Sequence, residues 1–252
     1  MNDGYIAILD SGVGGLSVLF EMIKLMPNEK YIYFGDNKNA PYGNRTKTDL
    51  VILTLKNIDI IMRYKIKALV IGCNTISTTI LEHVSSYSGV PTFGVFPPVE
   101  TVLTKTNNAL LLATLRTAKE YKNQNNITVL GLSNLASDIE NNLADLSRVN
   151  LIDNINNPNN VFYGNKNLKS NRFDTVILGC THYFFIKNKI HDHFRPQNLI
   201  DGSTFTAKAV FEYFKNAKSL GNNKHFAVNF IGKNAFLNER FFKQCGQFIK
   251  KN

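Results

Sequence analysis

The sequence predicts an α/β protein in which two similar parallel-sheet domains face each other across a cleft and are related by a pseudo-twofold axis. Unbroken apolar runs alternate with amphipathic stretches along the 252 residues, a pattern typical of parallel strands covered by helices on both faces. This rhythm occurs twice, and each half has an apolar run ending in Gly-Cys and polar residues, at 72–75 ("GCNT") and 179–182 ("GCTH"). Because ligands bind beyond the carboxyl ends of strands in open α/β sheets, both motifs are expected at one cleft.

The first half contains four short apolar runs rich in β-branched and aromatic residues, such as "YIAIL" and "YIYFG". Runs of this length that end at glycine or polar residues are expected to be strands, and longer segments with helical periodicity are expected to be helices. The expected strands are 5–9, 31–35, 67–72 and 91–96, and the expected helices are 16–25, 47–63 and one beginning near residue 75.

The second half repeats this order and then returns to the first. The expected strands are 109–113, 127–132, 175–179, 198–200 and 227–232. The expected helices are 135–147, 235–249 and segments after residues 182 and 200, while the Asn-rich segment 154–172 is expected to be a loop around a short strand. We assign residues 1–96 and 210–252 to the first domain and residues 97–209 to the second.

Composition limits the class of protein. With 44% hydrophobic residues the chain can bury one large or two medium cores, and it lacks the long apolar run that a membrane span needs. Its start has an acidic residue and no basic region before an apolar stretch, unlike a signal peptide. Three cysteines are too few for a disulfide scaffold, which predicts reduced thiols and a cytoplasmic protein.

The net charge of +10 raises the question of a nucleic-acid partner. The lysines are scattered singly, as in "YKIKAL" and "IKNKIHDHF", and no dense basic run is interleaved with aromatic residues. A solvated surface rich in lysine and asparagine is therefore the favoured interpretation, and we expect no nucleic-acid partner.

The glycine-rich segment 10–17 ("DSGVGGLS") joins the first expected strand to the first expected helix. Backbone N–H groups at such a helix start bind anions. The segment lacks the Gly-Lys-Ser/Thr of a P-loop and the third glycine of a dinucleotide fingerprint, so a small carboxylate is a better candidate ligand than a nucleotide. Asp10, at the strand end, and the turn Pro41-Tyr42-Gly43 are expected at the same cleft.

Cys73 and Cys180 occupy matching positions between a strand and a helix, 107 residues apart (180 minus 73). A helix N-terminus lowers the pKa of a thiol, so both are expected to be reactive, whereas Cys245 in the last helix is expected to be a buried apolar residue. Zinc binding would need more ligands, a hydrolase nucleophile would leave one thiol without a role, and a redox pair would normally show Cys-x-x-Cys. Inversion of a carbon centre by proton transfer needs an acid–base group on each face, which two thiols can provide.

Four segments together make the sequence resemble the glutamate racemase family of the cofactor-independent aspartate/glutamate racemases. They are 9–18 ("LDSGVGGLSV"), 33–43 ("YFGDNKNAPYG"), 72–77 ("GCNTIS") and 179–183 ("GCTHY"), with weaker similarity at 113–117 and 199–203. The resemblance extends over nearly the whole chain. It implies interconversion of L- and D-glutamate without cofactor or metal, D-glutamate supply for peptidoglycan, glutamate as the small-molecule partner, no membrane partner, and a homodimer as a candidate assembly.

The resemblance also implies roles for individual residues. Cys73 and Cys180 would be the catalytic acid–base groups, assisted by Asp10 and His182 respectively, with Glu140 as a further catalytic helper. The ammonium and α-carboxylate of the substrate would be bound by Asp10, Ser11, Asn74, Thr75 and Thr181. Its side-chain carboxylate would be bound by Tyr42, Gly43, Thr114 and Thr117. The substrate would also be contacted by Pro41 and His182.

The chain departs from the family pattern at Ile76, where alanine is usual, at Phe184, where proline is usual, and in the shortened segment after Thr117. Two alternatives therefore stay open: a related two-cysteine racemase for aspartate or a hydantoin, and a catalytically weakened family member that acts as a binding protein. The "PYG" turn and the glycine-rich segment favour glutamate over the first alternative, and salt-dependent DNA binding would favour the second.

Overall fold

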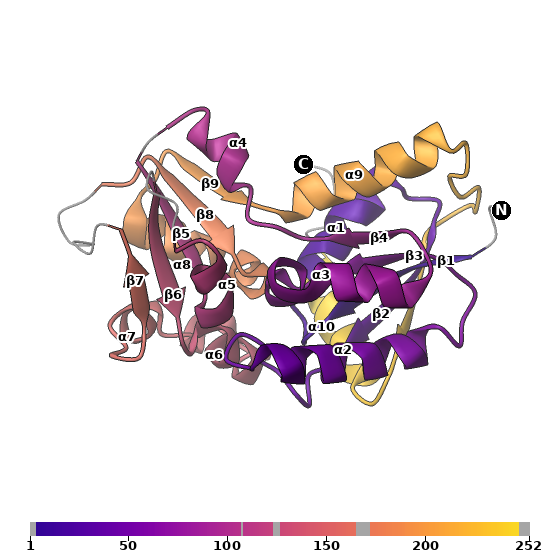
Figure 1. Ribbon diagram of the computed structural model, residues 1–252, viewed down its shortest axis with the longest axis horizontal. Coiled ribbons are helices and arrows are strands. Elements are labelled where there is room, and N and C mark those ends of the chain that lie inside the picture. Colours follow the sequence, from indigo (N-terminus) through magenta and orange to yellow (C-terminus); the bar gives the residue numbers. More distant parts are fainter. Residues whose placement is uncertain (1–3, 107, 123–126, 165–171, 247–252) are drawn as a thin grey trace.

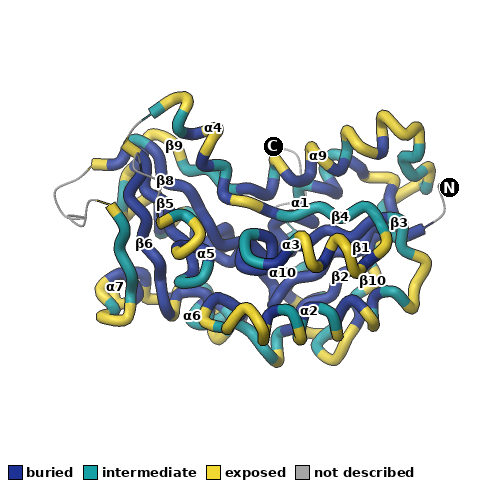
Figure 2. Tube along the Cα trace, viewed as in Figure 1, coloured by how far each residue is buried: buried dark blue, intermediate teal, exposed yellow. Residues whose placement is uncertain are grey.

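The protein consists of two α/β halves that lie side by side (Figure 1). The computed structural model describes residues 4–106, 108–122, 127–164 and 172–246. Each half is built around one five-stranded sheet. The central strands of each sheet are buried, and exposed residues concentrate on the outer helices and loops (Figure 2). The two-sheet α/β fold expected from the alternation of apolar and amphipathic segments is confirmed.

The first sheet is parallel throughout and has the strand order β10-β2-β1-β3-β4. Its strands are β1 (Tyr5–Asp10), β2 (Lys30–Gly35), β3 (Ile66–Ile71), β4 (Thr92–Gly94) and β10 (Ala227–Ile231). Successive side chains of a strand point to opposite faces, so Ile6 and Ile8 pack in one core and Ala7 and Leu9 in another. Helices α1 (Leu16–Leu25), α9 (Ser203–Asn216) and α10 (Ala235–Gln244) contribute to the first core, and α2 (Lys47–Ile61) and α3 (Asn74–Ser88) to the second.

The second sheet has the order β7-β6-β5-β8-β9. Its strands are β5 (Ala109–Thr114), β6 (Ile127–Leu132), β7 (Val161–Tyr163), β8 (Thr175–Gly179) and β9 (Asn198–Asp201). Its helices are α4 (Val99–Leu103), α5 (Leu115–Glu120), α6 (Leu135–Asn141), α7 (Leu151–Ile155) and α8 (Lys187–Phe194), with 3-10 turns η1 (Leu146–Arg148) and η2 (Thr181–Ile186). The edge strand β7 is antiparallel to β6, so among the described strands it alone departs from the expected parallel arrangement.

The two sheets repeat one topology. The orders β2-β1-β3-β4 and β6-β5-β8-β9 are equivalent, so β1 corresponds to β5 and β3 corresponds to β8. Cys73 follows β3 and Cys180 follows β8, which places the two cysteines at equivalent positions of the two halves. The repeat inferred from the matching Gly-Cys motifs therefore has a structural basis.

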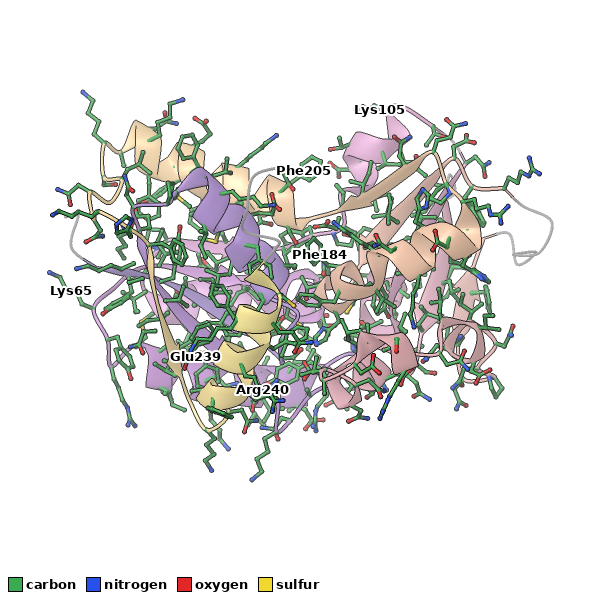
Figure 3. All side chains as sticks on the ribbon, turned by 180° about the vertical axis from the view of Figure 1, so that it is seen from behind. Lys65, Lys105, Phe184, Phe205, Glu239 and Arg240 are labelled. Atoms are coloured by element: carbon green, nitrogen blue, oxygen red, sulfur yellow. The ribbon has the colours of Figure 1, made fainter. Side chains whose placement is uncertain are left out.

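The chain crosses between the halves twice, after β4 and after β9. Helix α9 follows β9 and packs against α1 of the first half, and β10 then adds to the edge of the first sheet. The ring of Phe185 in η2 lies 4.9 Å from that of Phe241 in α10 and joins the cores of the two halves. Figure 3 shows α10, marked by Glu239 and Arg240, beside Phe184 at the centre of the molecule. The domain limits 96/97 and 209/210 stay a prediction.

Several local expectations differ from the structure. The helix expected after residue 182 is present as α8, but it begins only at Lys187. The segment Thr181–Ile186 before it is a buried 3-10 turn, because its aromatic and β-branched residues are weak helix formers. The helix expected at 135–147 ends at Asn141, since the side chain of Asn142 donates to the Asp138 carbonyl. Helices α4, α5 and α7 were not expected, and residues 165–171 of the predicted loop lie outside the described residues. In the described part of the chain, no helix is both long enough and apolar enough to cross a membrane.

Candidate active site

The carboxyl ends of the two sheets meet, and side chains that follow β1, β3, β5 and β8 contact each other between them. The Oγ1 atoms of Thr75 and Thr114 are 3.0 Å apart, and Thr181 Oγ1 donates to Asp10 Oδ2 over 3.4 Å. These contacts close the space between the halves, and the residues Cys73 and Cys180 retain exposed fractions of only 5% and 6%. Both thiols are therefore almost closed off from solvent in this structure.

The glycine-rich turn serves close packing between the halves. A Cβ atom on Gly12 would lie 1.8 Å from Glu140 Oε1, and one on Gly14 would lie 2.5 Å from both His182 Nδ1 and Thr181 Oγ1. Glycine at these two positions lets the turn after β1 approach the second half within hydrogen-bond distance. Val13 N–H, between them, donates to Glu140 Oε1 over 2.7 Å.

Cys180, His182 and Glu140 form a chain of contacts on the second half. The Cys180 sulfur is 3.8 Å from His182 Nδ1, and His182 Nε2 is 2.6 Å from Glu140 Oε1. An ionised carboxylate only accepts hydrogen bonds, so Nε2 carries the proton shared with Glu140. The structure thus brings together these three residues, which the resemblance had implied as catalytic.

The charges of His182 and Glu140 stabilise each other. Burial alone would lower the pKa of His182, but hydrogen bonds and charge from Cys180 and Glu140 raise it well above its ordinary value. Burial alone would raise the pKa of Glu140, but His182, the Val13 N–H and Asn37 together lower it. The pair is therefore an imidazolium and a carboxylate near neutral pH, with the imidazolium next to the Cys180 sulfur.

Cys73 has a different environment on the first half. Its Sγ donates to Ser11 Oγ over 3.7 Å. Burial raises the pKa of Cys73 to about 12, with a further contribution from the charge of Asp10. The expectation that a helix N-terminus lowers the pKa of this thiol is therefore wrong, because burial and the neighbouring carboxyl outweigh the backbone hydrogen bond at Ile76.

Asp10 sits between the two thiol environments. Its Oδ1 accepts the Gly12 N–H over 2.7 Å, and its Oδ2 accepts the Thr181 hydroxyl. Burial raises the pKa of Asp10 to about 6, although the charge of His182 partly opposes this effect. A carboxyl with this pKa can hold or release a proton near neutral pH.

The residues expected at the side-chain carboxylate form a second group. A Cβ on Gly43 would lie 2.5 Å from the Thr114 Cβ, so this turn contacts the end of β5 directly. The Thr114 hydroxyl is 3.2 Å from the Thr117 hydroxyl and caps α5 by accepting the Thr117 N–H. The hydroxyl groups of Thr75, Thr114 and Thr117 therefore form a continuous polar surface beside Gly43.

Two expected site residues, Tyr42 and Asn74, direct their side chains elsewhere. The buried Tyr42 hydroxyl donates to Asp36 Oδ2 over 2.6 Å, so the phenol is not available at the surface beside Gly43. The Asn74 amide donates to the Val95 carbonyl over 3.2 Å. Pro41 is half-buried in the turn before Tyr42.

One residue near the site was not found by sequence reasoning. Asn37, two residues after β2, donates from Nδ2 to Glu140 Oε2 over 3.1 Å. Its position directly after a strand of the first sheet was an available signal, although its partner comes from the other half. Cys245 is buried at the end of α10. Within the described ranges, no three His, Cys, Asp or Glu side chains are grouped as metal ligands would be.

Comparison with known proteins places the chain in a family. A model of the Asp/Glu/hydantoin racemase family matches residues 16–210, and the chain belongs to this family of isomerases.

A glutamate racemase of Clostridium botulinum strain Alaska E43 (type E3) is 36% identical to the chain over 220 residues, which cover 81% of each protein. One from the Okra strain (type B1) is 33% identical over 252 residues, covering 95% of this chain and 93% of the relative. The Escherichia coli glutamate racemase, solved with L-glutamate and the activator UDP-MurNAc-Ala, superposes with a TM-score of 0.75 at 26% identity, covering 97% and 95% of the two chains.

Proposed function

We propose that this protein is a glutamate racemase that moves the α-proton with two thiols, Cys73 and Cys180. The observation that carries the proposal is the pair of buried cysteines at equivalent strand ends of two facing sheets, each beside a different ionisable partner. The family match and the glutamate racemases similar over most of their length support the choice of substrate.

In the direction from L- to D-glutamate, the Cys180 thiolate takes the α-proton and becomes a thiol. The electron pair left on the α-carbon delocalises into the α-carboxylate, and the Cys73 thiol donates its proton to the opposite face and becomes a thiolate. The raised pKa of Cys73 keeps its thiol protonated, so it can serve as the proton donor in this direction, and the imidazolium of His182 lies next to Cys180.

The reverse direction needs the Cys73 thiolate, and the substrate ammonium can stabilise it. Asp10 lies beside Cys73 and offers a carboxyl to that ammonium. The Ser11 hydroxyl lies next to the Cys73 sulfur, and the Thr181 hydroxyl lies next to the Asp10 carboxyl. Backbone groups at Gly43, with Thr114 and Thr117, would receive the side-chain carboxylate. Donors whose positions are fixed by the fold can discriminate between a five-carbon and a four-carbon diacid, and the glutamate racemases among the relatives support glutamate over aspartate.

The first test is incubation with L-glutamate in D₂O, without cofactor and with EDTA. We expect D-glutamate to appear with deuterium at the α-carbon, and aspartate to react much more slowly. Activity that EDTA abolishes and zinc restores would overturn the cofactor-independent reading.

A second test separates the two thiols. Both Cys73→Ser and Cys180→Ser should lose racemisation in both directions, because a hydroxyl is a far weaker base near neutral pH and each turnover needs both groups. With 3-chloroglutamate, loss of HCl needs only removal of the α-proton. Cys73→Ser should therefore still eliminate from the L-form and Cys180→Ser from the D-form, whereas Cys245→Ser should leave both reactions nearly unchanged. Equal loss from both enantiomers in both variants would exclude the two-base assignment.

We further propose that the enzyme supplies D-glutamate for peptidoglycan in the cytoplasm, where the thiols of Cys73 and Cys180 stay reduced, as they are in the structure. A homodimer is the assembly that we propose for solution, and analytical ultracentrifugation would test it.

A further inference from the structure

Glu140 belongs to the second half, but two of its three described hydrogen-bond partners come from the first. Its Oε1 accepts from His182 of its own half and from the Val13 N–H, and its Oε2 accepts the Asn37 amide over 3.1 Å. The Glu140 side chain is 10% exposed. A nearly buried carboxylate depends on such donors to stay ionised.

The two donors of the first half hold the carboxylate in one orientation. Val13 offers a backbone N–H that no side-chain substitution removes, whereas Asn37 offers a side-chain amide at the other oxygen. With both oxygens occupied, Oε1 points at His182 Nε2 over 2.6 Å. Without the bond at Oε2 the carboxylate is free to rotate about its terminal torsion, which has a broad energy profile.

We infer that Asn37 is a positioning residue for the Cys180 half of the reaction: its amide fixes Glu140, and through Glu140 the proton on His182 beside Cys180. This inference rests on the proposed function. It also implies that the acid–base partner of Cys180 depends on both halves, because Val13 and Asn37 of the first half hold Glu140 of the second.

Other ionisable groups near Glu140 do not replace Asn37. His182 in η2 is its cationic partner, and Asp10 after β1 and Tyr33 in β2 feel its negative charge, which raises the pKa of each. None of these three groups donates to Oε2 in the structure. The amide of Asn37 is therefore the described contact that holds this oxygen.

The test uses 3-chloro-L-glutamate and 3-chloro-D-glutamate with the full-length protein. In Asn37→Ala, kcat/KM for elimination from the L-form should fall by about tenfold or more, as expected for one lost hydrogen bond to a charged group. Elimination from the D-form, which uses Cys73, should change by less than about threefold, a range typical of contacts outside the reacting group. An equal loss from both enantiomers would overturn the inference.

Asn37→Asp adds a pH readout, because it keeps the shape but replaces the donor by an acceptor. The neighbouring Glu140 carboxylate raises the pKa of the new carboxyl, so its proton, and with it a donor to Oε2, returns as the pH falls. Relative to the unchanged protein, L-form elimination by Asn37→Asp should therefore recover between pH 8 and pH 5.5, a range chosen to cross such a raised pKa. Asn37→Ala should show no recovery, and a pH-independent loss in Asn37→Asp would contradict the inference.

Asn44→Ala is the matched control. Asn44 also donates an amide hydrogen from the first half to the second, to the Ser133 carbonyl over 3.0 Å, but away from Glu140. If Asn37 acted only by holding the halves together, Asn44→Ala would produce the same preference for loss of L-form elimination. We expect it to produce none.

A spectroscopic readout does not depend on the substrate. The short bond from His182 Nε2 to Glu140 should give a downfield proton resonance, assigned by its loss in His182→Gln. The resonance should move upfield or vanish in Asn37→Ala and persist in Asn44→Ala. An unchanged resonance in Asn37→Ala would overturn the positioning role, even if the protein racemises glutamate. If the resonance shifts but the protein does not act on glutamate, only the proposed function is refuted.

Discussion

Gly12→Ala should disable the Cys180 side of the site by displacing Glu140. The added Cβ would lie 1.8 Å from Glu140 Oε1, and ordinary contact begins near 3.4 Å, so the carboxylate must move by about 1.6 Å, the difference between the two. The bonds from Oε1 to Val13 and His182 are 2.7 and 2.6 Å long, and a movement of this size breaks both.

The magnitude follows from those two bonds. Each is a hydrogen bond to a charged group, for which about 1.5–3 kcal/mol of stabilisation is typical. If Glu140 stays buried, losing both bonds removes roughly 3–6 kcal/mol of the interaction free energy that holds its carboxylate in place. The carboxylate can escape part of this cost by turning toward solvent. We expect kcat/KM for L-glutamate to fall by at least about a hundredfold, within the range of a misplaced acid–base group.

The assay measures racemisation of each glutamate enantiomer and uses circular dichroism to monitor the reaction. It is applied to a double-mutant cycle of Gly12→Ala and Glu140→Ala. If Gly12→Ala acts through Glu140, it should cost little further activity when Glu140→Ala is already present. Gly246→Ala is the control, because a Cβ there would meet no atom within 4 Å. Equal fold-losses from Gly12→Ala in both backgrounds would refute the reasoning and point to a distorted turn instead.

Two further predictions concern Tyr42 and Asp10. Tyr42→Phe should lower kcat/KM by less than tenfold, because the Tyr42 hydroxyl donates to Asp36 and not to the substrate. It should lower Tm by about 5 °C, because a buried hydrogen bond worth about 2 kcal/mol is lost. A large loss of kcat/KM would show that the phenol contacts the substrate. The pKa of Asp10 is about 6 in the folded protein and 3.8 ordinarily, so the unfolded chain releases this proton at lower pH. The free energy of unfolding should therefore fall by about 3 kcal/mol as the pH rises from about 4 through 6. In Asp10→Asn this component should vanish, so the Tm difference between acidic and neutral buffer should shrink, and an unchanged difference would contradict the raised pKa.

The strands and the two cysteines follow from local sequence. Runs such as "YIAIL" and "ITVLGL" are apolar throughout because their strands are covered on both faces, so their pattern survives without knowledge of neighbours. Cys73 and Cys180 were recognisable because each follows such a run directly. Helix ends were less predictable, since the limit of α6 depends on an asparagine side chain that competes for a backbone group.

What only the tertiary structure decided are the relations between the halves. The sequence shows the glycines of "DSGVGGLS" as a turn, but the carboxylate that Gly12 admits is 128 residues further along the chain. Likewise the raised pKa of Cys73 and the pairing of Asn37 with Glu140 arise from burial and charge contributed by segments that are distant in sequence. Periodicity reports which residues are buried, whereas hydrogen-bond partners and pKa values depend on which buried surfaces meet, and that is set by the packing of one half on the other.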